Sequence, residues 1–169
     1  MHVASRLAAV LLTLGLTTTM VGCGFHLKGT QVSNQPILYP KLNLALPQGT
    51  SELQKKLSVY LHADGIQLSQ AKDANTLRVL EYNPRRTVLN GKLTEVLLRL
   101  TVTFQIEDHE GNPITQPRTL STSRSFQYDS ATVNTGNQEE SYLNNIMIND
   151  IAQQIAQQVS SNRLPKVVK

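Results

Sequence analysis

The chain has 169 residues, of which 40% are hydrophobic and 17% charged, and these values are typical of one soluble globular domain. Its formal net charge of +4 suits an anionic partner, although many domains with this charge bind no polyanion. With no Trp, five Tyr and three Phe, it has too few aromatic residues for the stacking platforms that bind single-stranded nucleic acid, and we expect no nucleic-acid partner.

The first 22 residues have the features of a bacterial secretory signal peptide. Arg6 supplies a positive charge, and residues 7–16 (LAAVLLTLGL) form a short run that is almost wholly apolar. This run is too short to cross a bilayer as a helix, which takes about 20 residues. We therefore predict an exported protein whose signal peptide covers residues 1–22.

Cys23 is the one cysteine of the chain and directly follows that segment. A single cysteine cannot form an internal disulfide, which leaves an intermolecular disulfide, a free thiol or a lipid anchor. Residues 20–23 (MVGC) resemble the bacterial lipobox, in which a small residue, here Gly22, precedes the lipidated cysteine; Leu is more usual than Met20 at its first position. We predict a covalent lipid on Cys23, with S-diacylglycerol and N-acyl groups, and no cofactor.

Membrane attachment follows from this modification, because each buried CH2 of the acyl chains contributes about 0.8 kcal/mol. Gly24 stands where lipoproteins of the inner membrane typically carry Asp, so by resemblance to that sorting rule we expect the outer membrane. Residues 29–36 (GTQVSNQP) are polar and rich in turn formers. We interpret residues 23–36 as a lipidated N-terminus with a tether.

A strand over residues 41–46 and a helix over residues 52–63 are predicted next. Every second residue of the strand is leucine, which is the pattern of a half-buried strand. Ser51 and Gln54 predict a capping box before the helix, and Gly65 predicts its C-terminal stop. The apolar residues of the helix fall on one face: Leu53, Leu57, Tyr60 and Leu61.

Residues 75–89 and 93–107 form a predicted hairpin, the clearest unit of the sequence. Asn90 and Gly91 between them suit a two-residue type I′ turn, because both central residues of that turn need a positive φ. Such a turn places Leu77 opposite Phe104 and Val79 opposite Val102, which pairs apolar side chains with each other. It also places Arg86 opposite Glu95 as a cross-strand ion pair.

The second strand of the hairpin alternates between apolar and polar residues, which predicts one buried face and one solvated face. Its apolar positions are Val96, Leu98, Leu100, Val102, Phe104 and Ile106. Pro84, predicted opposite Leu97, has no N–H to donate. We therefore expect the distal half of the first strand to have no further strand beside it.

Residues 118–128 (RTLSTSRSFQY) alternate and predict a fourth strand, followed by a loop over residues 129–136. The last element is a helix over residues 137–162, which ends before Pro165. Its apolar stripe comprises Tyr142, Leu143, Ile146, Met147, Ile151, Ile155 and Val159.

The predicted order β-α-β-β-β-α indicates an α+β fold, a two-layer sandwich with two helices packed on a four-stranded, mainly antiparallel sheet. The second face of the sheet is polar. We expect this single domain to cover residues 37–164, with residues 165–169 as a C-terminal tail.

No pattern of residues predicts catalysis, a metal site or a cofactor. Asp108, His109 and Glu110 lie in a segment, residues 108–113 (DHEGNP), whose composition is that of a turn. There is no Gly-rich phosphate loop and no nucleophile elbow. The histidines lack the spacing of metal ligands: His2, His26, His62 and His109. We expect a protein that is not an enzyme.

Basic residues gather beside the predicted turn of the hairpin: Arg85, Arg86 and Lys92. Arginine binds phosphate groups bidentately. Charges on a sheet can equally serve only to solvate a face or to protect an edge. The residues alone leave both interpretations open. The Gln- and Asn-rich face of the last helix likewise suits either a polar barrel interior or plain solvent.

Residues 23–30 (CGFHLKGT) closely resemble the start of the mature lipopolysaccharide-assembly lipoproteins of the LptE (RlpB) family, with Cys-Gly, an aromatic residue, His-Leu and a basic residue. The element order, the hairpin and residues 124–126 (RSF) also resemble this family, over residues 23 to about 164. The resemblance implies an outer-membrane lipoprotein that lies as a plug inside the LptD β-barrel. Together the two proteins place lipopolysaccharide in the outer leaflet, without catalysis.

The resemblance also implies that the domain binds lipopolysaccharide through basic residues near the hairpin tip and before the last helix. Leu89 stands where the family often has a basic residue, and residues 133–136 (VNTG) contain no Lys or Arg. The hypothesis is therefore that Arg85, Arg86 and Lys92 bind lipopolysaccharide. The alternative is a periplasmic lipoprotein that scaffolds the envelope and binds no glycolipid. A third interpretation, an envelope hydrolase, finds no set of catalytic residues in this sequence.

Overall fold

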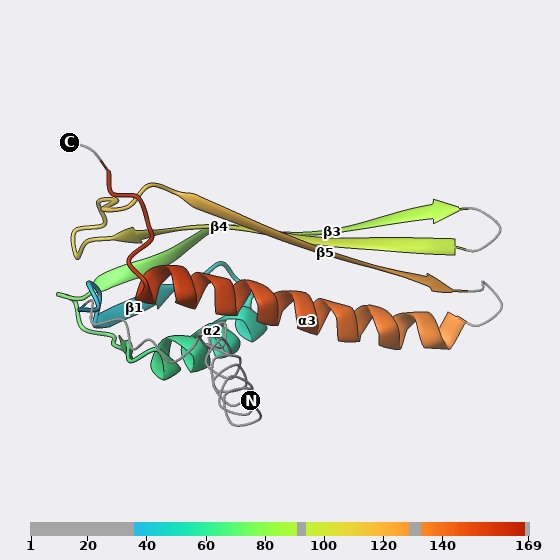
Figure 1. Cartoon of the computed structure of the whole chain (residues 1–169), viewed down its shortest axis with the longest axis horizontal. Coiled ribbons are helices and arrows are strands. Elements are labelled where there is room, and N and C mark those ends of the chain that lie inside the picture. Colours follow the sequence, from blue (N-terminus) through green and yellow to red (C-terminus); the bar gives the residue numbers. More distant parts are fainter. Residues whose placement is uncertain (1–35, 91–93, 129–132, 168–169) are drawn as a thin grey trace, which may run out of the picture. The chain divides into compact units, whose positions relative to one another are not determined.

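The computed structural model describes residues 36–90, 94–128 and 133–167. They lie in one compact unit, in which two helices pack on the same face of a five-stranded sheet (Figure 1). This arrangement confirms the predicted α+β fold. The elements are β1 (Lys41–Ala45), α2 (Ser51–Ala63), β2 (Gln67–Leu68), β3 (Asn75–Asn90), β4 (Thr94–Glu107), β5 (Arg118–Tyr128) and α3 (Val133–Ser160).

The strand order in the sheet is β2-β1-β3-β4-β5. β1 is parallel to both β2 and β3, whereas β3, β4 and β5 are antiparallel to one another. The prediction of four strands missed β2, because a strand of two residues is too short to show an alternating pattern. The sheet is therefore mixed.

The predicted register of the hairpin is wrong. Asn90 pairs with Thr94, so three residues separate the strands where a two-residue turn was expected. Arg86 consequently lies opposite Leu98, and the predicted Arg86–Glu95 pair does not form. The apolar pairs also differ from the prediction: Leu77 faces Ile106, and Val79 faces Phe104.

A β-bulge explains why the hairpin adopts this register. The pairing shifts between Val79 and Glu81, and Leu80 in between is 44% exposed. Side chains alternate along a strand, so without the extra residue Tyr82 would lie on the face opposite to Val79. The bulge brings the ring of Tyr82 to the core beside Leu77 and Val79, while Glu81 faces solvent.

The edge predicted at Pro84 is confirmed. β1 pairs only with the first residues of β3, up to Arg78. In the part of the chain that the structure describes, no strand lies beside the rest of that edge of β3. Pro84 thus lies in an edge strand, where proline is tolerated in sheets, although its partner across the hairpin is Leu100 and not Leu97.

The end of α2 is a Schellman motif, as the position of Gly65 predicts. The N–H of Gly65 donates to the carbonyl of His62 at 3.0 Å, and the N–H of Ile66 donates to that of Leu61 at 2.9 Å. Gly65 has φ +84°, which favours glycine. The predicted capping box is wrong, because the N-cap is Thr50 and its side chain makes no capping bond.

The core lies between the sheet and the two helices. α3 begins at Val133, four residues before the predicted start, in a segment whose composition had suggested a loop. Its predicted stripe is confirmed at the buried positions, but Tyr142 is 62% exposed. Fully buried large side chains come from every layer: Leu42, Leu53, Leu57, Leu61, Leu77, Phe104, Ile106, Ile151 and Ile155.

Candidate functional site

The arginines of β3 are separated by the alternation of the strand. Arg85 lies opposite Arg99 on the face that the helices leave uncovered. Arg86 lies on the helix-covered face, where its Nε donates to Oε2 of Glu140 in α3 at 3.0 Å. Lys92 and Cys23 lie outside the described residues. Two of the three basic residues proposed from the sequence thus point in opposite directions.

Two ion pairs join the sheet to α3. Besides Arg86–Glu140, Nη2 of Arg124 in β5 donates to Oδ2 of Asp150 at 2.5 Å. The four side chains are 25–45% exposed, so each pair contributes about 1 kcal/mol or less. We interpret both ion pairs as contacts that hold α3 against the sheet. Both arginines are therefore engaged within the domain.

The uncovered face of the sheet is polar, as the alternation predicts. Its hydroxyl groups form cross-strand contacts between β4 and β5. The oxygens of Thr101 and Ser121 are 3.3 Å apart, and those of Thr103 and Thr119 are 2.9 Å apart. Further along this face comes the Arg85–Arg99 pair, for which the sequence has no signal, because the loop length and the bulge decide which residues face each other.

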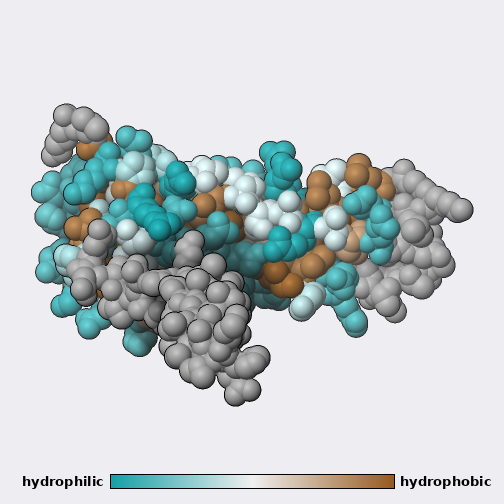
Figure 2. All heavy atoms as spheres, viewed as in Figure 1, coloured by the Kyte–Doolittle hydropathy of each residue, from teal (hydrophilic) through white to brown (hydrophobic). Residues whose placement is uncertain are grey.

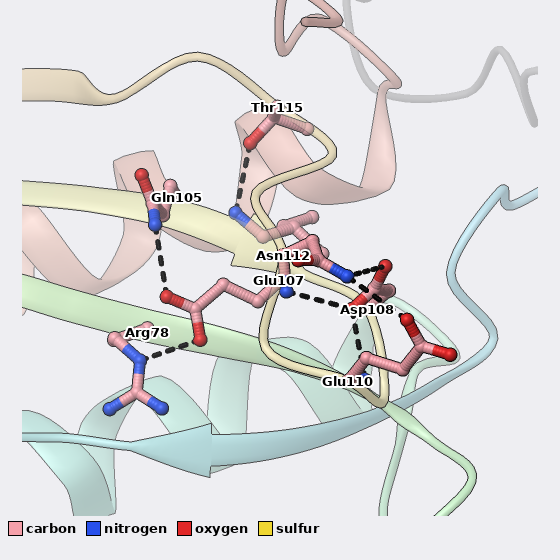
Figure 3. A network of polar contacts seen from close by, with 8 residues as sticks. Arg78, Gln105, Glu107, Asp108, Glu110, Asn112 and Thr115 are labelled. Atoms are coloured by element: carbon pink, nitrogen blue, oxygen red, sulfur yellow. Dashed lines mark hydrogen bonds and ion pairs between the residues drawn. The ribbon is translucent and has the colours of Figure 1, made fainter.

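A network of polar contacts joins β3 and β4 at the other end of the hairpin (Figure 3). Nε of Arg78 donates to Oε2 of Glu107 at 2.6 Å, and Nε2 of Gln105 donates to Oε1 at 2.9 Å. Glu107 is only 6% exposed, so these two donors replace its hydration. Arg78 is therefore engaged within the domain.

The segment after β4 is a turn, which confirms the prediction made from its composition. Oδ1 of Asp108 accepts from the backbone N–H of Asn112 at 2.8 Å and of Glu110 at 2.9 Å (Figure 3). These hydrogen bonds, that of Asn112 first, lower the pKa of the Asp108 carboxyl below its ordinary value. The Asp108 carboxylate therefore stabilises the turn.

An open groove of about 680 Å³ lies between α2 and β2. Its lining residues are Ser58, Val59, His62, Gln67 and Leu68. His62 is the one titratable group among these described lining residues. Among the described residues, no three His, Cys, Asp or Glu side chains are close enough to hold a metal ion.

Within the same residues, no helix has both the length and the apolar character needed to cross a membrane.

Comparison with known proteins gives a family match and several structural neighbours. The model of the family described as "LptE: Lipopolysaccharide-assembly" matches residues 32–159. The crystal structure of a minor lipoprotein from Acinetobacter baumannii is 65% identical, with a TM-score of 0.75, and the match covers 79% of this chain and 100% of that one. No curated protein matches the chain.

Two more distant structures share the fold alone. The rare lipoprotein B of Shewanella oneidensis is 22% identical, with a TM-score of 0.60 over 73% of this chain and 96% of that one. A lipoprotein B of Nitrosomonas europaea is also 22% identical, with a TM-score of 0.62 over 83% and 92% of the two chains.

Proposed function

The chain belongs to the LptE, lipopolysaccharide-assembly, family, and on this premise we propose that it is an outer-membrane lipoprotein that acts with the LptD β-barrel as its plug and assembly partner. The pair would insert lipopolysaccharide into the outer leaflet, a role without catalysis. The observation that carries the proposal is the family match over residues 32–159.

The surface of the domain supports a place inside a barrel lumen, since the interior of a large outer-membrane barrel is polar. The uncovered face of the sheet presents Thr and Ser hydroxyls. The outer face of α3 adds exposed amide side chains: Asn145, Gln153, Gln154 and Gln157. Such groups can exchange hydrogen bonds with water for hydrogen bonds with a polar barrel wall.

The test is an affinity pull-down from detergent-solubilised outer membranes with a C-terminally tagged chain. We expect a large β-barrel protein to elute in stoichiometric amount. An unrelated outer-membrane lipoprotein with the same tag, taken through the same steps, serves as the control. Elution without a barrel would reject the plug role and favour the envelope-scaffolding alternative.

Lipopolysaccharide binding by the basic hairpin belongs to the same proposal. Replacing Arg85, Arg86 and Lys92 together with Glu should weaken lipopolysaccharide binding about tenfold or more, because a hydrogen bond to a charged group contributes about 1.5–3 kcal/mol. Titration of the purified chain with lipopolysaccharide measures the change.

The triple variant needs a control, because Arg86 forms an ion pair with Glu140 of α3. Arg86→Glu would place a carboxylate against Glu140 and loosen α3 from the sheet. The double variant Arg85→Glu/Lys92→Glu keeps that ion pair intact, and thermal unfolding shows whether each variant is folded. Unchanged affinity in a folded triple variant would contradict binding by these residues.

A further inference from the structure

Two arginines face each other across the hairpin. Arg85 of β3 and Arg99 of β4 are direct partners in the antiparallel ladder, and both are exposed. The Cβ atoms of residues so paired lie about 4.5–5.5 Å apart. Like charges at this separation repel each other and destabilise the hairpin. An anion between the two guanidinium groups would turn this repulsion into attraction.

Three other arginines of the sheet are paired with acids, among them Arg86 of β3 with Glu140. Arg78 pairs with Glu107, and Arg124 pairs with Asp150. Among the described residues, no carboxylate forms an ion pair with Arg85 or with Arg99.

The nearest acids of these two strands on the uncovered face are Glu81 and Glu95. Each lies four positions along its strand from the arginine, which is about 13 Å at the rise of a β-strand. The positive charge of the Arg85–Arg99 pair is therefore available to a partner from solution.

The surroundings of the pair combine hydroxyl groups with apolar side chains. Ser123 of β5 lies opposite Arg99. On the same face, towards the tip of the hairpin, follow the half-buried Leu97 and then Leu89, which is 52% exposed. Hydrophobic and hydrophilic residues also lie side by side over the halves of the strands that are nearer to the hairpin tip (Figure 2). Cationic and apolar groups in this order fit a ligand with an anionic head and a hydrocarbon body.

We propose that Arg85 and Arg99 form a two-arginine clamp for the phosphate group of an anionic amphiphile, whose hydrocarbon lies along Leu97 and Leu89. The oxygens of a phosphate monoester can accept from both guanidinium forks at once. The inference rests on the proposed function and deepens it. In the observed register, the residue that binds the phosphate together with Arg85 is Arg99 and not Arg86. The ligand class is an acylated phosphate.

The experiment measures binding of short-chain phosphatidic acid to the full purified chain, with short-chain phosphatidylcholine and inorganic phosphate as comparison probes. Arg99→Gln should weaken phosphatidic acid binding about tenfold, since one charged pair of hydrogen bonds is lost. Arg118→Gln is the matched control. It removes the same charge from the exposed start of β5, opposite Phe104 and away from the pair, and should change the affinity less than about twofold.

Arg85→Gln should reproduce the effect of Arg99→Gln, because the clamp needs both residues, and it serves as the second variant if Arg99→Gln does not fold. Equal effects of Arg99→Gln and Arg118→Gln would overturn the clamp. Inorganic phosphate that binds as tightly as phosphatidic acid would overturn the amphiphile, as would phosphatidylcholine that binds equally well.

The failure of the clamp and the failure of the proposed function give different results. Wild-type and Arg99→Gln chains that bind lipopolysaccharide equally and co-purify with a barrel would overturn the clamp alone. A chain that binds neither barrel nor lipopolysaccharide, yet binds phosphatidic acid in an Arg99-dependent way, would support the clamp and reject the proposed function.

Discussion

Replacing Phe104 with Ala lowers the free energy of unfolding by about 3–5 kcal/mol, the usual cost of removing a buried ring and leaving a cavity. The Phe104 side chain is fully buried in β4, the strand between β3 and β5, and belongs to the core formed with α3. Small domains have a total stability of about 5–15 kcal/mol. A single substitution at this position therefore removes a large part of the stability of the domain.

Urea unfolding followed by circular dichroism measures the change. Phe104→Leu keeps part of the volume and should cost about 1–2 kcal/mol. Val59→Ala is a surface control at a side chain that is 66% exposed, with an expected change within about 0.5 kcal/mol. A loss of less than about 1 kcal/mol for Phe104→Ala would contradict a tightly packed core around Phe104.

Replacing Cys23 with Ala moves the protein from the membrane fraction to the soluble periplasmic fraction. The proposed lipid is the anchor of the domain, and at about 0.8 kcal/mol per buried CH2 its acyl chains account for a partition change of about a thousandfold or more. Fractionation with immunoblotting measures the distribution, and intact mass spectrometry measures the lipid itself.

Met20→Leu, which introduces the usual lipobox residue, is the control and should keep the protein lipidated and in the membrane. Binding to a barrel could retain an unlipidated chain at the membrane, so the mass decides between the two causes. A wild-type chain without the mass of the acyl groups would contradict lipidation at Cys23.

Local sequence signals account for most of the elements. The predicted bounds of the last strand, residues 118–128, agree with those of β5, because alternation between the two faces continues along that whole segment. Gly65 marks the end of α2, since a positive φ and two backbone hydrogen bonds are needed within a few residues of each other. The fold class follows from the order of such elements.

The register of the hairpin and the pairing of β2 could not be predicted from the sequence. The register of β3 against β4 depends on a loop of three residues and on the bulge at Leu80, which exists because Tyr82 packs in the core formed with α3. Asn90 and Gly91 favoured a shorter turn, but the burial of side chains decided the pairing. The short β2 pairs with β1, from which α2 separates it in the chain.

In the candidate site, too, local sequence patterns predicted some features and tertiary packing decided the others. The sequence by itself determined a basic, hydroxyl-rich hairpin and an apolar segment followed by one cysteine, because composition and alternation are properties of neighbouring residues. Only the tertiary structure decided that Arg86 pairs with Glu140 while Arg85 faces Arg99. A shift of one residue in a β-ladder exchanges the two faces of a strand, and that shift is set by packing between segments far apart in the chain.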